Sequence, residues 1–195
     1  SSTAVTAVDE DSLYSYTVTG DDVDANDGMT LSVTSTLPTW LSFDATSGVL
    51  SGTPLNAHVG TQSVTVQAED TAGATGTQTF TITISNTNDA PTVDSTAVTA
   101  VDEDSSYLYT VTASDVDVGD NVALSATIGS SSAWLSFEPS TGKLTGTPAN
   151  GDVGTHSITV TATDDDGATG TQTFTITVAN TNDAPTISST AVIAV

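Results

Sequence analysis

The segment Thr77-Gln-Thr-Phe-Thr-Ile-Thr-Ile84 alternates threonine with Phe80, Ile82 and Ile84. Successive side chains of an extended strand point to opposite faces, so the three apolar residues share one face and the threonines the other. Such alternation is typical of an antiparallel strand with one buried face. The segment returns as Thr171-Gln-Thr-Phe-Thr-Ile-Thr-Val178. The chain is therefore expected to hold two copies of one β domain.

The repetition extends over the whole chain. Thr3-Ala-Val-Thr-Ala-Val-Asp-Glu-Asp11 returns 93 positions later at Thr96, and Trp40-Leu-Ser-Phe43 returns 94 positions later at Trp134. A fixed period of this kind indicates a tandem array in which each repeat is one structural unit. We predict repeat 1 at 1–90, repeat 2 at 91–184, and the start of a truncated third repeat at 185–195, where the opening phrase begins again. The chain is expected to be part of a longer array.

Other segments follow the same two-residue period, and no segment carries a helical one. The residues predicted to face inward are Val64, Val66 and Ala68 with their copies Ile158, Val160 and Ala162, Tyr14, Tyr16 and Val18 with their copies Tyr107, Tyr109 and Val111, and Phe174, Ile176 and Val178. Glycine turns, among them Asp27-Gly28 and Ala72-Gly73, separate the strands. The predicted class is all-β, as two Greek-key sandwiches in tandem.

The chain is strongly acidic. It has 24 Asp and Glu against one basic residue, Lys143, which gives a formal net charge of −23. Such a charge repels nucleic acid and anionic lipid, so we expect neither as a partner. No apolar run approaches the roughly 20 residues of a membrane helix, and we expect no membrane insertion. There is no cysteine, so a structural metal is one remaining way to stabilise small domains.

The acids gather in four short stretches per repeat. They are Asp9-Glu-Asp11, Asp22-Val-Asp24, Glu69-Asp70 and Asn86-Thr-Asn-Asp89 in the first, and Asp102-Glu-Asp104, Asp115-Val-Asp117, Asp164-Asp-Asp166 and Asn180-Thr-Asn-Asp183 in the second. Carboxylates held close together repel one another unless a cation lies among them, and calcium takes six to eight such oxygens. An EF-hand loop starting at Asp22 fails, because Asp27 and Val33 replace its glycine and its glutamate. Calcium ligands would have to converge from several segments.

These motifs together resemble a cadherin repeat. The stretch Leu37-Pro-Thr-Trp-Leu-Ser-Phe43, followed by Gly48-Val-Leu-Ser-Gly-Thr-Pro54, is similar to the dystroglycan-type cadherin-like domains of very large bacterial surface adhesins. The resemblance implies two tandem cadherin/immunoglobulin-like Greek-key β-sandwiches with calcium at the joint. The residues it implies for the interdomain site are Glu10, Asn86, Asn88, Asp89, Ala90 through its carbonyl, Asp115, Asp117 and Asp164.

The resemblance also implies two half-sites. Those that would face a preceding repeat are Asp22, Asp24 and Asp70, and those that would face a following repeat are Glu103, Asn180, Asn182 and Asp183. The Leu-Asp-Arg-Glu motif of animal cadherins is missing, so fewer or weaker ions per joint should follow. The expected function is a calcium-rigidified extender of a large adhesin that is secreted or held at the cell surface.

Several alternatives stay open. Acids can simply coat a solvated surface, as we expect of Asp44, Asp94, Glu138 and Asp152, and Asp27 and Asp120 are equally well explained as turn residues. Trp40 and Trp134 could stack on sugars in a module that binds cell-surface or matrix polysaccharide, although packing at the sandwich edge is favoured. Homophilic adhesion between arrays is a third function. His58 and His156 are expected to be exposed, and no catalytic constellation is found, so no enzyme activity is expected.

Overall fold

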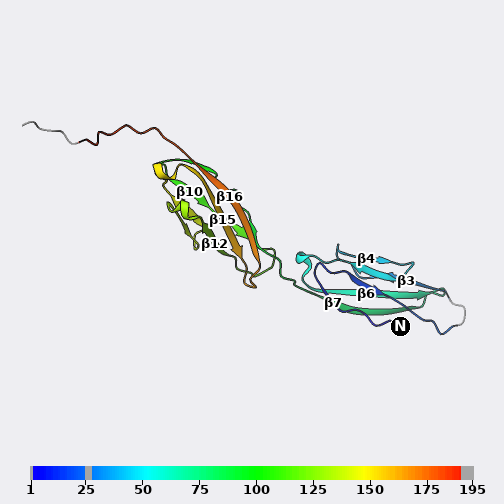
Figure 1. The fold of residues 1–195 in the computed structure, drawn as a ribbon. Coiled ribbons are helices and arrows are strands. Elements are labelled where there is room, and N and C mark those ends of the chain that lie inside the picture. Colours follow the sequence, from blue (N-terminus) through cyan, green and yellow to red (C-terminus); the bar gives the residue numbers. More distant parts are fainter. Residues whose placement is uncertain (1, 25–27, 190–195) are drawn as a thin grey trace, which may run out of the picture. The chain divides into compact units, whose positions relative to one another are not determined.

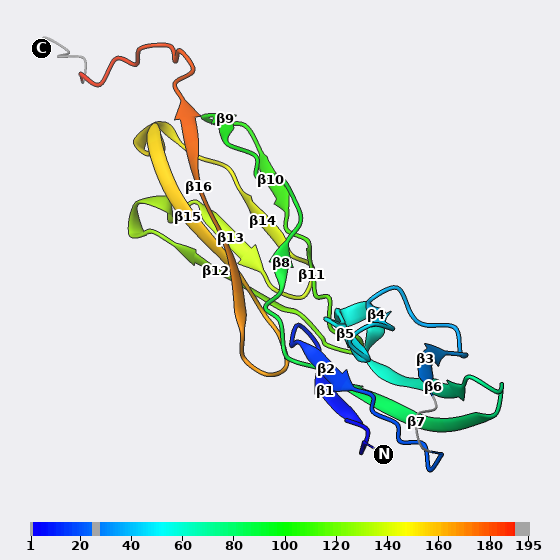
Figure 2. The same ribbon diagram turned by 90° about the vertical axis from the view of Figure 1, so that its right-hand side faces the viewer.

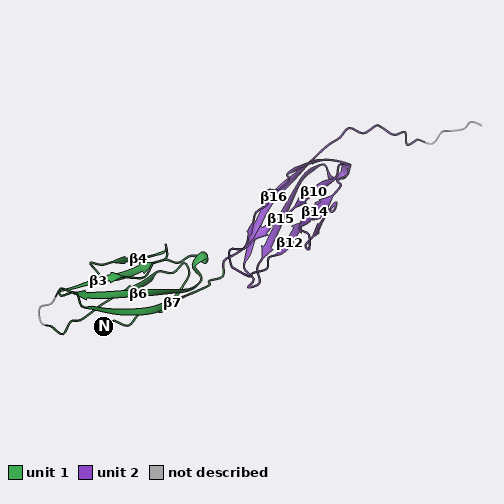
Figure 3. Cartoon of the chain, turned by 180° about the vertical axis from the view of Figure 1, so that it is seen from behind, with its two compact units in different colours: residues 1–88 green, residues 89–195 purple. Residues whose placement is uncertain are grey.

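The computed structural model describes residues 2–24 and 28–189 of the chain. The chain divides into two compact units, Ser1–Asn88 (unit 1) and Asp89–Val195 (unit 2), drawn in two colours in Figure 3. The predicted turn at Asp27 and residues 190–195 of the predicted third repeat lie outside the described residues. The predicted third repeat is therefore described only for residues 185–189, where no strand forms.

Unit 1 is a sandwich of two sheets (Figure 1). The larger sheet has the order β1-β7-β6-β3, in which β1 runs parallel to β7 and the other pairs are antiparallel. Its strands are β1 (Ala7–Asp9), β7 (Thr75–Ser85), β6 (Gly60–Asp70) and β3 (Met29–Val33). The smaller sheet is antiparallel and consists of β2 (Tyr14–Thr17), β5 (Val49–Gly52) and β4 (Leu41–Asp44), with the 3-10 turn η1 (Asn56–His58) after it.

Unit 2 repeats this plan. Its larger sheet is β12 (Ala123–Ile128), β15 (Gly154–Thr163), β16 (Thr169–Ala179) and β9 (Ala100–Asp102), again with one parallel pair at the β9 edge. Its smaller sheet is β10 (Tyr107–Thr110), β14 (Lys143–Gly146) and β13 (Leu135–Glu138). The 3-10 turns are η2 (Ser130–Ser132) and η3 (Asn150–Asp152). This confirms the predicted all-β class.

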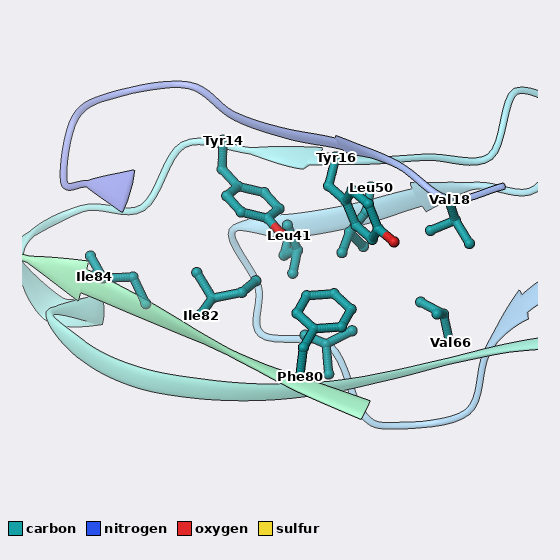
Figure 4. Packing of buried hydrophobic residues seen from close by; sticks show 10 residues of the cluster. Tyr14, Tyr16, Val18, Leu41, Leu50, Val66, Phe80, Ile82 and Ile84 are labelled. Carbon is teal, nitrogen blue, oxygen red and sulfur yellow. The ribbon is translucent and has the colours of Figure 1, made fainter. Parts of the chain in front are cut away.

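The predicted apolar faces form the cores. Phe80, Ile82 and Ile84 of β7 are buried, and Tyr14 and Tyr16 of β2 reach toward them across the sandwich (Figure 4). The rings of Tyr16 and Phe80 meet edge to face at 5.4 Å, an arrangement that aromatic quadrupoles favour. The same contact recurs in unit 2 between Tyr109 and Phe174. The two-residue period therefore predicted the core correctly in both units.

Unit 2 has a pair of short strands without a counterpart among the described residues of unit 1. The strands β8 (Thr92–Val93) and β11 (Ala113–Ser114) pair antiparallel with the register Ala113 to Val93 and Ser114 to Thr92 (Figure 2). β8 also contacts β15 and β16. The segment from Pro91 to Val93 therefore covers one end of the unit 2 sandwich.

The prediction that both histidines are exposed was wrong for His156, which is 4% exposed, and His58 is half-buried. His156 lies on β15 two residues before Ile158, so the alternation that buries Ile158 also buries His156. Its Nε2 donates to the carbonyl of Asp152 at 2.6 Å, and in the neutral ring Nδ1 accepts from Ser132 Oγ at 3.0 Å. Burial is tolerated because both ring nitrogens have partners.

Candidate metal centre

A buried glutamate lies at the same end of each sandwich. Glu10 follows β1 and Glu103 follows β9, and each is 1% exposed. Glu10 Oε1 accepts the backbone N–H of Thr87 at 2.7 Å, and Glu103 Oε1 accepts that of Thr181 at 2.6 Å. The preceding strands fix both residues, because the backbone N–H of each glutamate donates to the end of the neighbouring long strand, at Ser85 and Ala179. Each glutamate therefore holds the segment that leaves its unit.

The second carboxylate oxygen of each glutamate is the unusual feature. Glu10 Oε2 and Glu103 Oε2 are buried and have no hydrogen-bond partner among the described residues. An ionised carboxylate removed from water with an oxygen unsatisfied costs several kcal/mol unless a cation or donor compensates it. The same orphaned atom in both units shows that it belongs to the repeat and not to one local irregularity. It fits an oxygen that ligates a cation.

Three aspartates of unit 2 gather at the opposite end of its sandwich. Asp115, Asp117 and Asp120 each offer one carboxylate oxygen, and these oxygens lie within 4.8 Å of one another. Calcium–oxygen distances are about 2.3 to 2.6 Å, so one ion can touch all three oxygens. Asp115 Oδ2 and Asp120 Oδ2 are buried without a hydrogen-bond partner within the described part of the chain. The ligand set is oxygen only, which suits calcium or magnesium and not a metal that prefers nitrogen or sulfur.

Local hydrogen bonds hold these aspartates in place. The backbone N–H of Asp117 donates to Asp115 Oδ1 at 2.9 Å, which fixes the side chain of Asp115 against the turn. Asp117 Oδ2 accepts the N–H of Asp89 at 2.7 Å. Asp164 Oδ1 accepts the N–H of Ala168 at 2.8 Å in the turn after β15. Asp117 and Asp164 are buried, while Asp115 and Asp120 are half-buried, so hydrogen bonds and partial burial hold these carboxylates in place.

Asp120 belongs to the cluster although the sequence explained it equally well as a turn residue. Burial, together with the carboxylates of Asp115, Asp117, Asp166 and Asp164, raises the pKa of Asp120. Like charges this close disfavour ionisation until a cation enters. Two features of the sequence could have identified Asp120 as a candidate ligand. They are its spacing, Asp115-x-Asp117-x-x-Asp120, and the aspartate at the equivalent position of the first repeat, Asp27.

The other predicted ligands are not gathered in this way. Asp22 and Asp24 are exposed and are joined by the hydrogen bond from Asp24 N–H to Asp22 Oδ1 at 2.8 Å, while Asp70 Oδ1 accepts from Ala72 and Ala74 in its own turn. The remaining residues of the predicted sites are also exposed, namely Asn86, Asn88, Ala90, Asn180, Asn182 and Asp183. Their role as ligands stays a prediction.

The tryptophans pack as favoured by the sequence. Trp40 and Trp134 are half-buried, lie against the two cores, and meet Tyr14 and Tyr107 edge to face at 6.0 and 5.8 Å. Trp134 also contacts the ring of His156 at 5.7 Å. These contacts explain both residues as core packing.

The two β-sandwiches, with carboxylates gathered at their ends, are a tandem pair of immunoglobulin-like modules. Both units match the family described as "Putative Ig domain", over residues 1–85 and 90–179, and the chain belongs to this family. The family description is broader than the dystroglycan-type branch, and membership of that branch stays a prediction.

The relatives that match include an adhesin. The chain is 33% identical over 130 residues to the "Serine-rich adhesin for platelets" of Staphylococcus aureus strain MRSA252, a match that covers 65% of this chain and 9% of that protein. Among solved structures, the protocadherin GammaB4 extracellular domain matches at 20% identity with a TM-score of 0.51, over 88% of this chain and 33% of that one. This likeness shows the fold.

A further structural match is to the endo-fucoidan hydrolase MfFcnA4 of glycoside hydrolase family 107, at 27% identity, over 91% of this chain and 28% of that one. Its TM-score of 0.40 is too low to carry an argument. Within residues 2–24 and 28–189, no helix has the length and apolar character needed to cross a bilayer.

Proposed function

We propose that the chain is a pair of extender repeats from a large bacterial adhesin, secreted or held at the cell surface, and that Ca²⁺ bound where one repeat follows the next stiffens the array. The observation that carries this proposal is the buried, unpartnered oxygen of Glu10 and its copy at Glu103. A buried carboxylate oxygen without a partner destabilises the fold, and this free-energy cost arises in both repeats. A bound cation would offset it. Family membership and the adhesin relative support an extracellular, non-enzymatic role.

The covalent chain supports one shared site between the repeats. Glu10 of unit 1 holds Thr87, and Asp117 of unit 2 holds Asp89. Thr87 and Asp89 are two residues apart, so their Cα atoms are separated by at most about 7 Å. We therefore assign to the joint the ligands Glu10, Asp89, Asp115, Asp117 and Asp164, with Asp120 added, and with Asn86, Asn88 and the Ala90 carbonyl as further oxygens.

The same logic assigns the two outer ends to neighbouring repeats of the parent chain. Asp22, Asp24 and Asp70 form the half-site toward a preceding repeat, and Glu103, Asn180, Asn182 and Asp183 the half-site toward a following one. Calcium is favoured over magnesium because six to eight oxygens from flexible segments suit its larger and less strict coordination shell. Because only the folded joint would bind the ion, calcium would also stabilise the folded state by mass action.

A calorimetric titration of CaCl2 into EDTA-treated protein tests the proposal. An extracellular module is expected to bind with a dissociation constant of about 10⁻⁴ to 10⁻³ M. At a hundredfold excess over that constant, the free energy of unfolding should rise by about 2.7 kcal/mol. Small-angle scattering should show a longer maximum dimension with calcium than with chelator, because the joint is then held straight.

The variant Asp117→Asn should weaken binding by about tenfold or more, since it removes a charged ligand. Asp44→Asn is the matched control, because it makes the same change of charge at an exposed aspartate on β4. Absence of binding heat and of any change in unfolding temperature up to millimolar calcium would contradict the proposal. An equal effect of both substitutions would point to general charge screening instead.

A polysaccharide-binding module, in which calcium shapes the recognition surface, ranks second. It would use Trp40 or Trp134, and the edge-to-face packing of both rings on tyrosine favours a structural role for them. A glycan pull-down with Trp134→Ala distinguishes the two functions, because only the second requires that ring.

A further inference from the structure

Asn150 and Gly151 form the only Asn-Gly dipeptide among the eight asparagines of the chain. They are the first two residues of the 3-10 turn η3 in unit 2, and both are exposed. The bond between asparagine and glycine is chemically labile, because glycine has no Cβ to hinder attack of its backbone nitrogen on the asparagine side chain and restricts the backbone angles least. This turn therefore carries a reactive position on the surface of unit 2.

The surroundings of Gly151 leave its backbone nitrogen available. The hydrogen bond that closes η3 runs from the N–H of Asp152 to the Ala149 carbonyl at 2.8 Å and does not use the N–H of Gly151. The first N–H groups of a helical turn have no partner within that turn. A Cβ atom added at Gly151 would meet no described atom within 4 Å. The attacking nitrogen therefore belongs to an uncrowded residue and lies outside the bond that closes the turn.

The turn itself controls the reaction. The side-chain carbon of Asn150 reaches the Gly151 nitrogen only when the backbone of Asn150 leaves the helical region of φ and ψ, so η3 must open first. The turn is also held by the N–H of Ala149, which donates to Asp152 Oδ2 at 2.9 Å, and by His156 Nε2, which donates to the Asp152 carbonyl at 2.6 Å. A single turn with so few bonds opens locally more often than the whole domain unfolds.

The side chain of Asn150 links η3 to the segment that follows β16. Asn150 Nδ2 donates to Asp183 Oδ2 at 2.6 Å. The same segment is held two residues earlier, where Glu103 Oε1 accepts the N–H of Thr181 at 2.6 Å. A carboxylate at position 150 has no proton to donate at neutral pH, so repulsion between two negative charges would replace the bond to Asp183.

We propose that Asn150 is a site of spontaneous deamidation, controlled by opening of η3, and that the reaction releases Asp183 from unit 2. The Gly151 nitrogen attacks Asn150 Cγ and forms a new C–N bond, the Cγ–Nδ2 bond breaks, and Nδ2 leaves as ammonia with the proton that the Gly151 nitrogen loses. Water then opens the cyclic imide at either of its carbonyl carbons, which gives aspartate or isoaspartate. Each event adds one negative charge to the chain.

The released contact lies in the half-site toward a following repeat. The proposed function assigns Asn180, Asn182 and Asp183 to that half-site, so deamidation would change the joint as the protein ages. This consequence alone rests on the proposed function. The reaction and the release need no calcium and are tested in EDTA, so their failure and a failure of calcium binding are seen separately.

Unit 1 supplies a matched control for the chemistry. Asn56 begins η1, the equivalent turn, and is followed by Ala57 in place of glycine. In folded protein kept for weeks at physiological temperature and mildly alkaline pH, peptide mapping by mass spectrometry should show deamidation of Asn150 at least about tenfold faster than that of Asn56. Gly151→Ala should remove this difference. Equal rates at the two asparagines, or an unchanged rate at Asn150 in Gly151→Ala, would overturn the proposal.

A second variant tests control by the turn. Asp152→Ala removes the bond from the Ala149 N–H to Asp152 Oδ2 and should accelerate deamidation of Asn150, because η3 then opens more often. Glu138→Ala is the control, since it removes an exposed acid elsewhere in unit 2 and should leave the rate unchanged. The same rate in both variants would show that η3 does not control the reaction.

Hydrogen exchange of the Thr181 amide tests the release, because its bond to Glu103 holds the same segment. Asn150→Asp reproduces one product of the reaction, and Asn150→Ala removes the bond to Asp183 without adding charge. In EDTA, exchange should be slowest in the unchanged chain, faster in Asn150→Ala and fastest in Asn150→Asp. Exchange in Asn150→Asp that is no faster than in the unchanged chain would contradict the release of Asp183.

Discussion

Replacement of Gly170 by alanine is expected to unseat the segment Pro91–Val93 from unit 2. The new Cβ would lie 1.8 Å from the Pro91 carbonyl oxygen, and real Cβ contacts stay beyond 3.0 Å. The strand must therefore move by about 1.2 Å, too far for its short hydrogen bonds to survive. The bonds at risk are the pairing of β8 with β11 and the 2.8 Å bond from Asp94 N–H to the Thr112 carbonyl.

The magnitude follows from these bonds. Two or three hydrogen bonds at about 1 kcal/mol each give a loss of about 2 to 3 kcal/mol. Removal of a strand glycine returns about 0.5 to 1 kcal/mol. The net destabilisation of unit 2 is about 2 kcal/mol, or roughly 8 to 16 °C in unfolding temperature for a domain of this size. Gly76→Ala, where an added Cβ would meet no described atom within 4 Å, should be neutral or slightly stabilising in this chain, because only the glycine effect remains.

Each unit has one tryptophan, which makes the assay specific. In a Trp40→Phe background, the fluorescence of Trp134 reports denaturant unfolding of unit 2, since that ring packs on Tyr107. Gly76→Ala is followed through Trp40 in a Trp134→Phe background. A cost below about 1 kcal/mol for Gly170→Ala, or equal costs for the two substitutions, would refute the close contact between Gly170 and the Pro91 segment.

Three further outcomes are expected. In EDTA, Asp120→Asn should stabilise unit 2 at pH 7, because it removes a carboxylate whose pKa is raised in the folded state and whose ionised form is therefore unfavourable there. The stabilisation should shrink as pH falls, since the wild-type carboxyl then takes up its proton and the wild-type protein becomes more stable. Unfolding curves between about pH 7 and pH 4 measure this difference. His156→Ala should lower the free energy of unfolding, measured in urea, by about 3 kcal/mol, because it leaves a cavity and removes the hydrogen-bond partner of Ser132 and of the Asp152 carbonyl. The control Thr155→Ala, at an exposed neighbouring position, should change it little. Leu144→Ala, at a fully buried position, should cost about 2 to 5 kcal/mol, against almost nothing for the exposed Thr145→Ala.

The core was predictable because its signal is local. Phe80, Ile82 and Ile84 are buried as their alternation requires, and so are Tyr14 and Tyr16. His156 obeys the same alternation, whereas the prediction of its exposure rested on the absence of a histidine at the equivalent position of the first repeat, Gln62. The all-β class followed from the same period, repeated in both halves of the chain.

The candidate metal centre was predictable in part. The acidic stretches singled out Glu10, Asp115 and Asp117, yet Asp120 seemed equally well explained as a turn residue, because nothing local shows where a carboxylate points. The burial of Glu10 and Glu103 and their orphaned oxygens arise from strands distant in sequence, which close over side chains that a charge count would place in solvent.

By itself the sequence determined the repeat, the strand faces, the acidic composition and the absence of thiol chemistry, since each of these depends on neighbouring residues or on counting. Tertiary structure alone decided which carboxylates lose their water, where His156 finds its partners, and that the segment Pro91–Val93 packs at Gly170 and pairs with β11. Burial and pairing depend on segments that are distant in the sequence and are brought together only by the fold.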